Sequence, residues 1–201
     1  MRQVAGILGV ATLVAAIAGC SSPPPAAPPS FAPPTTLTAQ NLQPPAQIGA
    51  LPQVIYDPCT WIPDSVVSKA GYNPASRQRY MDQTTDPVSI ILGCRFLDDA
   101  DGRFKQKFDL HIDSANIGLA EGRRQAEATG HQLQITPINI NGRAGFELRD
   151  AYYGTSCFTF LATRIGYVRL HRITLPSGPI DVCEKILDLT ELIEPTIGSD
   201  N

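Results

Sequence analysis

The sequence predicts an α+β fold, in which a mainly antiparallel sheet of about six strands carries packed helices. Two observations lead to this class. Runs of alternating apolar and polar residues occur in pairs separated by short turn signals, and Asn141-Gly142 is the strongest of these turns. Helical patterns stand as isolated insertions between the pairs, so the strands are expected to form antiparallel hairpins.

The chain opens with a pattern typical of a bacterial lipoprotein signal peptide. Arg2 precedes an uncharged apolar run that ends in Ile17-Ala18-Gly19-Cys20, a lipobox. The run is about 14 residues long, whereas a spanning helix needs about 20. We therefore expect residues 1–19 to be removed and Cys20 to carry diacylglycerol and often a further fatty acid such as palmitate, which anchors the protein to a membrane. The alternative is an ordinary secretory signal with a coincidental cysteine.

Residues 20–53 predict a disordered, proline-rich linker. They contain no Asp, Glu, Lys or Arg and hold ten of the eighteen prolines. Such a composition favours polyproline II and cannot build a core, so the segment would act as a spacer of up to about 100 Å. An alternative is a proline-rich ligand for a partner's aromatic groove. The remainder predicts one globular domain over 54–197 and a short tail over 198–201.

The folded part of the chain is mildly acidic, with fifteen Lys and Arg against nineteen Asp and Glu. This balance gives no reason to expect nucleic acid as a partner. A segment of this size buries enough surface for one stable hydrophobic core.

The first predicted elements are a short helix and a hairpin. The helix covers residues 62–71, with Pro63 at its first position and Gly71 as its stop. The hairpin strands cover 89–96 and 104–112, on either side of an Asp- and Gly-rich turn.

The second half predicts two helices and two further hairpins. A helix over 119–129 has an Ala and Leu face, although Gly122 is unfavourable inside it. The last helix, about 180–193, repeats apolar residues with helical spacing and should lie on the sheet. The hairpin strands between these helices cover 133–140 with 143–149, and 157–163 with 167–173.

Four cysteines remain in the domain once Cys20 is lipidated: Cys59, Cys94, Cys157 and Cys183. An even number in an exported protein indicates two disulfides, and three pairings are open. We favour Cys59 with Cys94 and Cys157 with Cys183, because each pair joins a helix start to a strand and the loops do not cross. The wide spacing and the lack of C-x-x-C argue against zinc, and no metal or cofactor is expected.

Several local motifs resemble a family of uncharacterised actinobacterial lipoproteins, the mycobacterial LprB/LprC type. These motifs are Asp57-Pro58-Cys59, Gly93-Cys94-Arg95-Phe96 and the stretch 138–146, followed by Cys157 and Cys183. The resemblance covers roughly residues 56–193. It implies a cell-envelope lipoprotein whose domain of unknown function is similar to the PsbP-like α/β/α sandwiches, and it brings no catalytic residues.

Two groups of residues are candidates for binding. The first is a basic face for an anionic lipid headgroup, a glycan acid or an acidic partner, with surface histidines as the alternative interpretation. Its residues are Arg95, Lys105, Lys107, Arg169 and His171. The second is an aromatic interface at Tyr152 and Tyr153, which turn packing would explain equally well.

No G-x-S-x-G, H-E-x-x-H, P-loop or G-x-G-x-x-G motif occurs in the sequence. We therefore expect an extracytoplasmic, membrane-anchored module that acts by binding another envelope component. The alternative is a carrier that shelters an apolar lipid between sheet and helices, and an enzyme of unrecognised type is a third hypothesis. A lipid-sized internal cavity would favour the carrier, and a solid core would favour the binding module.

Overall fold

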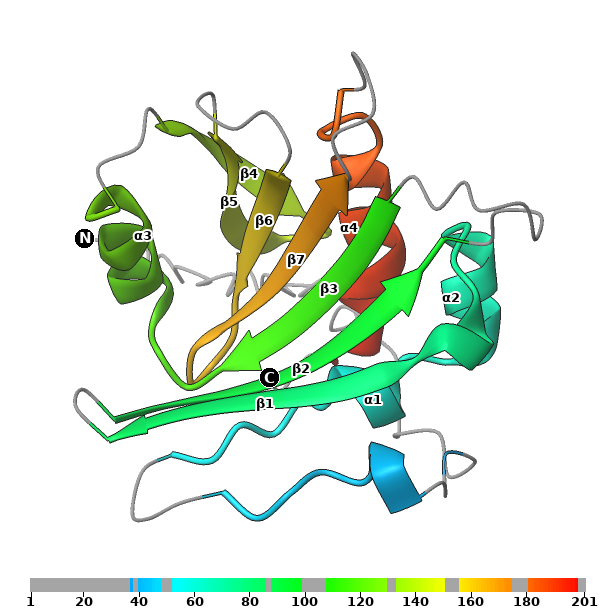
Figure 1. Ribbon diagram of the computed structural model, residues 1–201. Coiled ribbons are helices and arrows are strands. Elements are labelled where there is room, and N and C mark those ends of the chain that lie inside the picture. Colours follow the sequence, from blue (N-terminus) through cyan, green and yellow to red (C-terminus); the bar gives the residue numbers. More distant parts are fainter. Residues whose placement is uncertain are drawn as a thin grey trace, which may run out of the picture.

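A computed structural model describes residues 37, 40–47, 52–85, 88–98, 108–129, 133–150, 156–174 and 181–198, without the side chains of 81–88. Its strands form one seven-stranded sheet, and every neighbouring pair is antiparallel. The spatial order is β1-β2-β3-β7-β6-β5-β4 (Figure 1). The predicted α+β class is therefore confirmed, with one strand more than expected.

The bounds of the strands are β1 Gln78–Thr85, β2 Val88–Leu97, β3 Phe108–Ala115, β4 Leu133–Ile140, β5 Arg143–Asp150, β6 Ser156–Ala162 and β7 Tyr167–Thr174. The α-helices are α1 Pro58–Trp61, α2 Asp64–Lys69, α3 Leu119–Glu127 and α4 Ile186–Ile193. Short 3₁₀ helices cover Gln40–Leu42, Pro74–Ser76 and Glu194–Thr196.

Strand β1 is the element that the sequence did not predict. Its residues, QRYMDQTT, are mostly polar and show no alternation of apolar side chains. The strand forms because β2 offers it a complete edge, with partners from Gln78 opposite Arg95 to Thr85 opposite Val88. Main-chain pairing with β2 therefore makes this segment a strand, although its own composition does not indicate one.

The first predicted helix is divided in two. Asp57 caps α1 by accepting a hydrogen bond from the Cys59 amide at 3.2 Å, so helix begins earlier than expected. Pro63 then precedes α2 as its N-cap residue instead of occupying the first helical position. The predicted stop at Gly71 agrees with its φ of +85°.

The last helix begins later than predicted. Lys185 has a φ of +66°, a left-handed conformation that separates a turn over 181–185 from α4. Cys183 lies in this turn, and the Asp181 side chain accepts a hydrogen bond from its amide at 2.9 Å. Arg172 also donates to the carbonyl oxygens of Val182 and Glu184, which holds the turn against β7.

Helix α4 lies behind the sheet in Figure 1, and we call the face that it covers the back face. The apolar side of α4 packs there against strands β6 and β7. A hydrogen bond of 2.7 Å between the hydroxyl groups of Thr190 and Thr159 joins helix to sheet. The largest side chains with less than 2% exposure in this core are Tyr56, Ile62, Phe96, Leu110, Ile112, Leu161, Leu170, Ile186, Ile193 and Ile197.

Both predicted disulfides are present. Cys59 in α1 is bonded to Cys94 in β2, and their Cα atoms lie 5.0 Å apart. Cys157 in β6 is bonded to Cys183 in the turn before α4, with a Cα separation of 5.2 Å. Each bond therefore fastens a segment on the back face to the sheet, and the favoured pairing is confirmed.

Part of the segment expected to be a disordered linker is folded against the domain. Leu42 is buried and belongs to the main hydrophobic core. Its carbonyl oxygen accepts hydrogen bonds from two nitrogens of Arg79, which also binds the Asp57 carboxylate at 2.5 Å. The boundary at residue 53 is thus too late, because the sequence pattern does not reveal that Arg79 and the core hold Leu42.

The hairpin at Asn141-Gly142 is confirmed, with φ values of +52° and +92°. Next to it, the mostly buried side chains of Arg143 and Glu194 form an ion pair of 2.9 Å. Arg143 also donates to the carbonyl oxygens of Ala162 and Gly198. The C-terminal segment is therefore fastened to the β4-β5 hairpin.

Helix α3 carries the chain from β3 to the far edge of the sheet at β4, and it packs on the face opposite α4. Its Gly122 is buried, and a Cβ atom placed there would lie 2.6 Å from the ring of Tyr167 on β7. The glycine that makes this segment a poor helix by propensity is therefore what lets it approach the sheet.

We expect Gly122→Ala to destabilise the protein by about 1–3 kcal/mol, although the same change inside an exposed helix is stabilising. The added methyl group must displace the Tyr167 ring. Gly118→Ala is the control, because no atom lies within 4 Å of its added Cβ. Urea unfolding of both variants measures the difference, and equal stability would contradict the packing described here.

Candidate functional site

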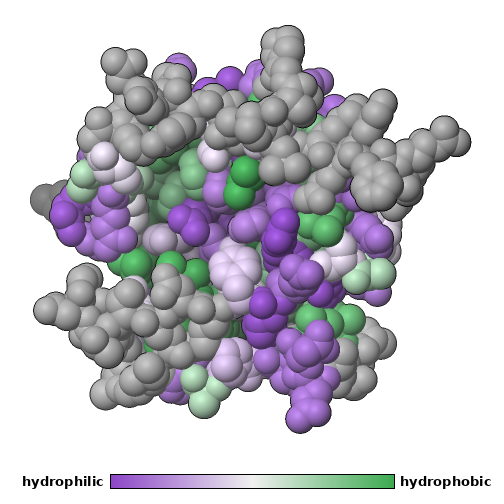
Figure 2. Space-filling view, in the orientation of Figure 1, coloured by the Kyte–Doolittle hydropathy of each residue, from purple (hydrophilic) through white to green (hydrophobic). Residues whose placement is uncertain are grey.

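The face of the sheet opposite α4, here called the front face, carries a group of polar side chains on neighbouring strands. Cross-strand pairing places Arg95, His111, His171 and Phe158 in one row across β2, β3, β7 and β6. A second row contains Tyr80, Gly93, Asp113, Arg169 and Phe160. In Figure 2 hydrophilic residues run across the middle of this face, with hydrophobic residues on both sides.

We call the following residues the polar band: Tyr80, Arg95, Asp109, His111, Asp113, Arg169 and His171.

Tyr80 reaches the polar band by crossing over β2. A Cβ atom on Gly93 would lie 2.2 Å from the Tyr80 ring, so the ring rests directly on the glycine backbone. The Tyr80 hydroxyl donates a hydrogen bond to Oδ1 of Asp113 on β3. Any side chain at position 93 would prevent this contact, which gives Gly93 a specific role within the strand.

Two arginines on the front face are each paired with a carboxylate beneath them. Arg169 donates to Asp113 from Nε at 2.7 Å and from Nη2. Arg95 donates to Asp109 from Nε at 2.9 Å and from Nη2. The side chains of Asp113 and Asp109 are 0% and 15% exposed, whereas those of Arg169 and Arg95 are 27% and 38% exposed. The guanidinium groups therefore form the accessible part of each pair.

The two histidines of the polar band lie between these arginines. The rings of His111 and His171 are edge to face with centroids 5.7 Å apart, and the Nε2 atom of each is buried without a hydrogen-bond partner. Burial, then the charges of Arg169 and His111, lower the pKa of His171 to about 2. Burial and the Arg95 charge also lower the pKa of His111. Both imidazoles are therefore neutral at neutral pH.

Aromatic rings continue the polar band toward β5. The His171 ring stacks on Phe158 with centroids 3.9 Å apart, and Phe146 stacks on Phe160 at 4.4 Å. The Arg169 guanidinium carbon lies 5.9 Å from the centroids of both Phe158 and Phe160. These contacts hold the arginine against a rigid aromatic surface.

The structure brings together three of the five residues predicted for a basic face: Arg95, Arg169 and His171. Lys105 and Lys107 lie outside the described residues. Sequence reasoning missed the carboxylates of Asp109 and Asp113, although both alternate with His111 on the same strand. It also missed Tyr80, because β1 was not predicted. Within the described part of the chain the two arginines are balanced by two carboxylates, so this face carries no excess of positive charge.

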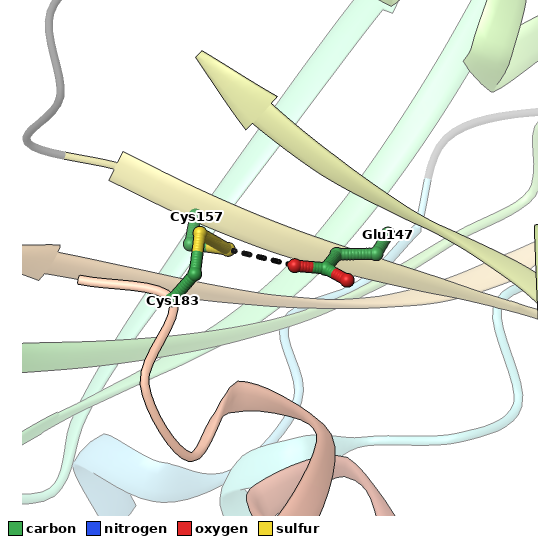
Figure 3. Close-up of side chains that lie close together, drawn as sticks. All are labelled: Glu147, Cys157 and Cys183. Carbon is green, nitrogen blue, oxygen red and sulfur yellow. Dashed lines mark hydrogen bonds between the residues drawn. A yellow bond between two sulfur atoms is a disulfide. The ribbon is translucent and has the colours of Figure 1, made fainter. Parts of the chain in front are cut away.

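A second cluster lies on the back face, where Glu147 approaches the Cys157–Cys183 disulfide (Figure 3). Glu147 Oε1 lies 3.8 Å from the Cys157 sulfur and accepts a hydrogen bond of 2.7 Å from Arg149. Among the described residues these three side chains are the one group with the spacing of metal ligands. Because both sulfur atoms belong to the disulfide, they are not thiolate ligands in this form.

The other sequence-predicted site residues, Cys20, Tyr152 and Tyr153, lie outside the described residues. Within the described ranges, no helix is both long and apolar enough to cross a bilayer.

A comparison with family models decides which family the sequence represents. The model that matches is described as a protein of unknown function, DUF3558, and it covers residues 15–196. The chain belongs to the DUF3558 family. No curated protein and no solved structure matches it significantly. The expected membership of an uncharacterised domain family is thus confirmed, and the DUF3558 assignment gives no residue a role.

The partly buried His171 should make this DUF3558 protein sensitive to acid. In the unfolded chain a histidine binds a proton below a pH of about 6.5, whereas the folded chain keeps His171 neutral, so stability falls as the pH falls. Each pH unit below 6.5 costs about 1.4 kcal/mol, or about 2 kcal/mol between pH 7 and pH 5.

His171→Phe keeps the stacking on Phe158 and removes the titrating group. We expect this variant to lose about 2 kcal/mol less stability than the unaltered protein between pH 7 and pH 5. Urea unfolding at the two pH values measures the loss. If the free energy of unfolding fell equally with pH in the two proteins, the fold would not keep His171 neutral.

Proposed function

We propose that this protein is a lipid-anchored component of the cell envelope whose folded part is a non-catalytic binding module. The proposal rests on the polar band, because it presents arginine, tyrosine and histidine side chains on the sheet, next to the rings of Phe158 and Phe160. Arginine and aromatic residues are enriched at binding surfaces and at their energetic hot spots, because each buries a large area, and arginine also offers several hydrogen-bond donors. We further propose a relationship to the LprB/LprC type of lipoprotein and to the PsbP-like sandwich.

The packing of the back face favours a binding module over a lipid carrier. A cavity for an acyl chain between sheet and helices would leave its lining accessible to a sphere the size of water. Ile112 and Leu170 on the sheet and Ile186 on α4 are instead fully buried. The space in which a carrier would hold its lipid is therefore filled by side chains at these positions.

The lipobox supports the proposed anchor. Lipid chains on Cys20 would hold the protein at the outer side of a membrane, and two or more chains suffice for durable binding. Because Leu42 is fastened to Arg79, at most the residues between Cys20 and Gln40 act as a spacer. At about 3.1 Å per residue this spacer reaches about 60 Å. This is shorter than the length of about 100 Å that the sequence predicted for residues 20–53.

Cys20→Ser tests the anchor. The unaltered protein should sediment with membranes and incorporate radioactive palmitate, whereas the variant should do neither, because it lacks the thiol that forms the thioether. Cys59→Ser with Cys94→Ser is the control, since it removes cysteines without touching the lipobox. Equal palmitate incorporation by the Cys20→Ser variant would refute the anchor.

Site-specific photocrosslinking in intact cells tests the binding surface. Gln78 is exposed and lies directly beside Arg95 on the front face, so a photoreactive residue there should yield a discrete crosslinked product. The same residue at Glu191, exposed on α4, should not yield this product. If both positions give the same pattern, or neither gives a product, the front face is not the binding surface.

A further inference from the structure

The Cys157–Cys183 disulfide differs from the Cys59–Cys94 disulfide in its surroundings. Cys59 and Cys94 are both 0% exposed, whereas Cys183 is 7% exposed in the turn before α4. Among the described residues, the Cys157–Cys183 pair is also the one with a carboxylate at metal-ligand spacing, that of Glu147. One ligand atom from each of these three residues lies within 4.8 Å of the other two. A thiol reagent therefore reaches this pair first, and reduction leaves two thiols beside a carboxylate.

The backbone on both sides of this disulfide is held by hydrogen bonds that do not need the S–S bond. Cys157 lies within β6, between β5 and β7. The turn that carries Cys183 is fastened by Arg172, which donates to the carbonyl oxygens of Val182 and Glu184. Reduction therefore leaves the two Cα atoms near their separation of 5.2 Å. Two sulfurs on one tetrahedral zinc ion lie about 3.8 Å apart, because each Zn–S bond is about 2.3 Å long, and side-chain rotation supplies this spacing.

Glu147 supplies a third ligand. Its side chain is 9% exposed and points toward the disulfide from β5, the strand next to Cys157 (Figure 3). Its Oε1 atom lies 3.8 Å from the Cys157 sulfur and accepts a hydrogen bond of 2.7 Å from Arg149 Nε. Among the described residues its Oε2 atom has no hydrogen-bond partner, which leaves that oxygen available to an ion. The guanidinium group orients the carboxylate and offsets part of the negative charge of two thiolates.

We propose that the reduced form of this domain binds a zinc ion, or an ion of the same borderline-soft class, through Cys157, Cys183 and Glu147. Thiolates disfavour the hard ions Mg²⁺ and Ca²⁺, and the carboxylate disfavours a purely thiophilic ion such as Cu⁺. Three protein ligands leave the fourth tetrahedral position to water. No C-x-x-C signals this site in the sequence, because its ligands come from β5, β6 and the turn before α4. The site lies on the back face and is independent of the binding function proposed for the front face.

The site forms in two balanced steps. A dithiol reductant attacks the Cys183 sulfur through one thiolate and breaks the bond to Cys157. Its second thiol resolves the mixed disulfide, so the reductant leaves as a disulfide and the protein gains two electrons and two protons. Zinc then replaces both thiol protons, which pass to solvent. The disulfide and the metal ion are thus alternative fastenings of the same turn to β6.

Thiol labelling tests where reduction occurs and whether zinc binds there. The full-length chain carrying Cys20→Ser, purified in detergent, is reduced with dithiothreitol, which is then removed without oxygen. Iodoacetamide and peptide mass spectrometry should identify Cys157 and Cys183 as the first cysteines to be modified. Stoichiometric zinc should slow their modification about tenfold or more, because a metal-bound thiolate is a poor nucleophile. Earlier modification of Cys59 and Cys94, or labelling that zinc does not affect, overturns the inference.

Cobalt binding to the same reduced protein reports the ligands, because thiolates give a charge-transfer band in the near ultraviolet. Glu147→Gln should weaken cobalt binding about tenfold or more, because a neutral amide is a poorer ligand than a carboxylate. Glu184→Gln is the matched control and should leave the affinity unchanged, because this carboxylate adjoins Cys183 in the sequence but is exposed and outside the cluster.

Three outcomes of the cobalt titration contradict the site: no charge-transfer band, equal affinity of the two variants, or equal affinity of the chain in urea. Circular dichroism of the reduced protein completes the test. The reduced domain should keep its folded spectrum, because Arg172 holds the turn without the disulfide. Unfolding on reduction would also overturn the inference, since the three ligands would no longer be held together.

Discussion

The pairing of β3 with β7 holds the two halves of the sheet together. Strands β1 to β3 form one meander and β4 to β7 another, and within each meander consecutive strands are neighbours. Among the strands that the structure describes, the β3-β7 ladder, from Phe108 opposite Thr174 to Ala115 opposite Tyr167, is the one that joins the two meanders. On its back face Ile112 meets Leu170 in the core, and on its front face Asp113 meets Arg169. The candidate site is thus built on the junction that completes the fold.

Two glycines allow close contacts on the front face. Gly93 lets the Tyr80 ring cross β2 to Asp113, and Gly122 lets α3 approach Tyr167. Both positions weaken the local propensity for strand or helix, so each is a local cost that a tertiary contact offsets.

The sequence predicted most elements and both disulfides because those signals are local. The Asn141-Gly142 turn and the alternation along β3 can each be recognised within a few residues. The even number of cysteines leaves three possible pairings. Strand β1, the docking of Leu42 and the break at Lys185 depend on partners distant in the chain, such as Arg79 and Arg172. The same limit applies to the site, because Arg169 and Asp113 are 56 residues apart and only the sheet register makes them a pair.

On the proposed binding surface, the way the charges are buried determines which ligands the front face would select. Two arginines and two aspartates cancel in number, so the polar band exerts little long-range field on an approaching ion, and the net negative charge of the domain does not attract an anion. At contact distance the accessible charge is positive, because Asp113 is covered and the guanidinium edge of Arg169 is not. Selection on such a surface depends on hydrogen-bond geometry within the first contact layer. It should therefore favour ligands whose oxygens fit a guanidinium fork over ligands that are merely negative.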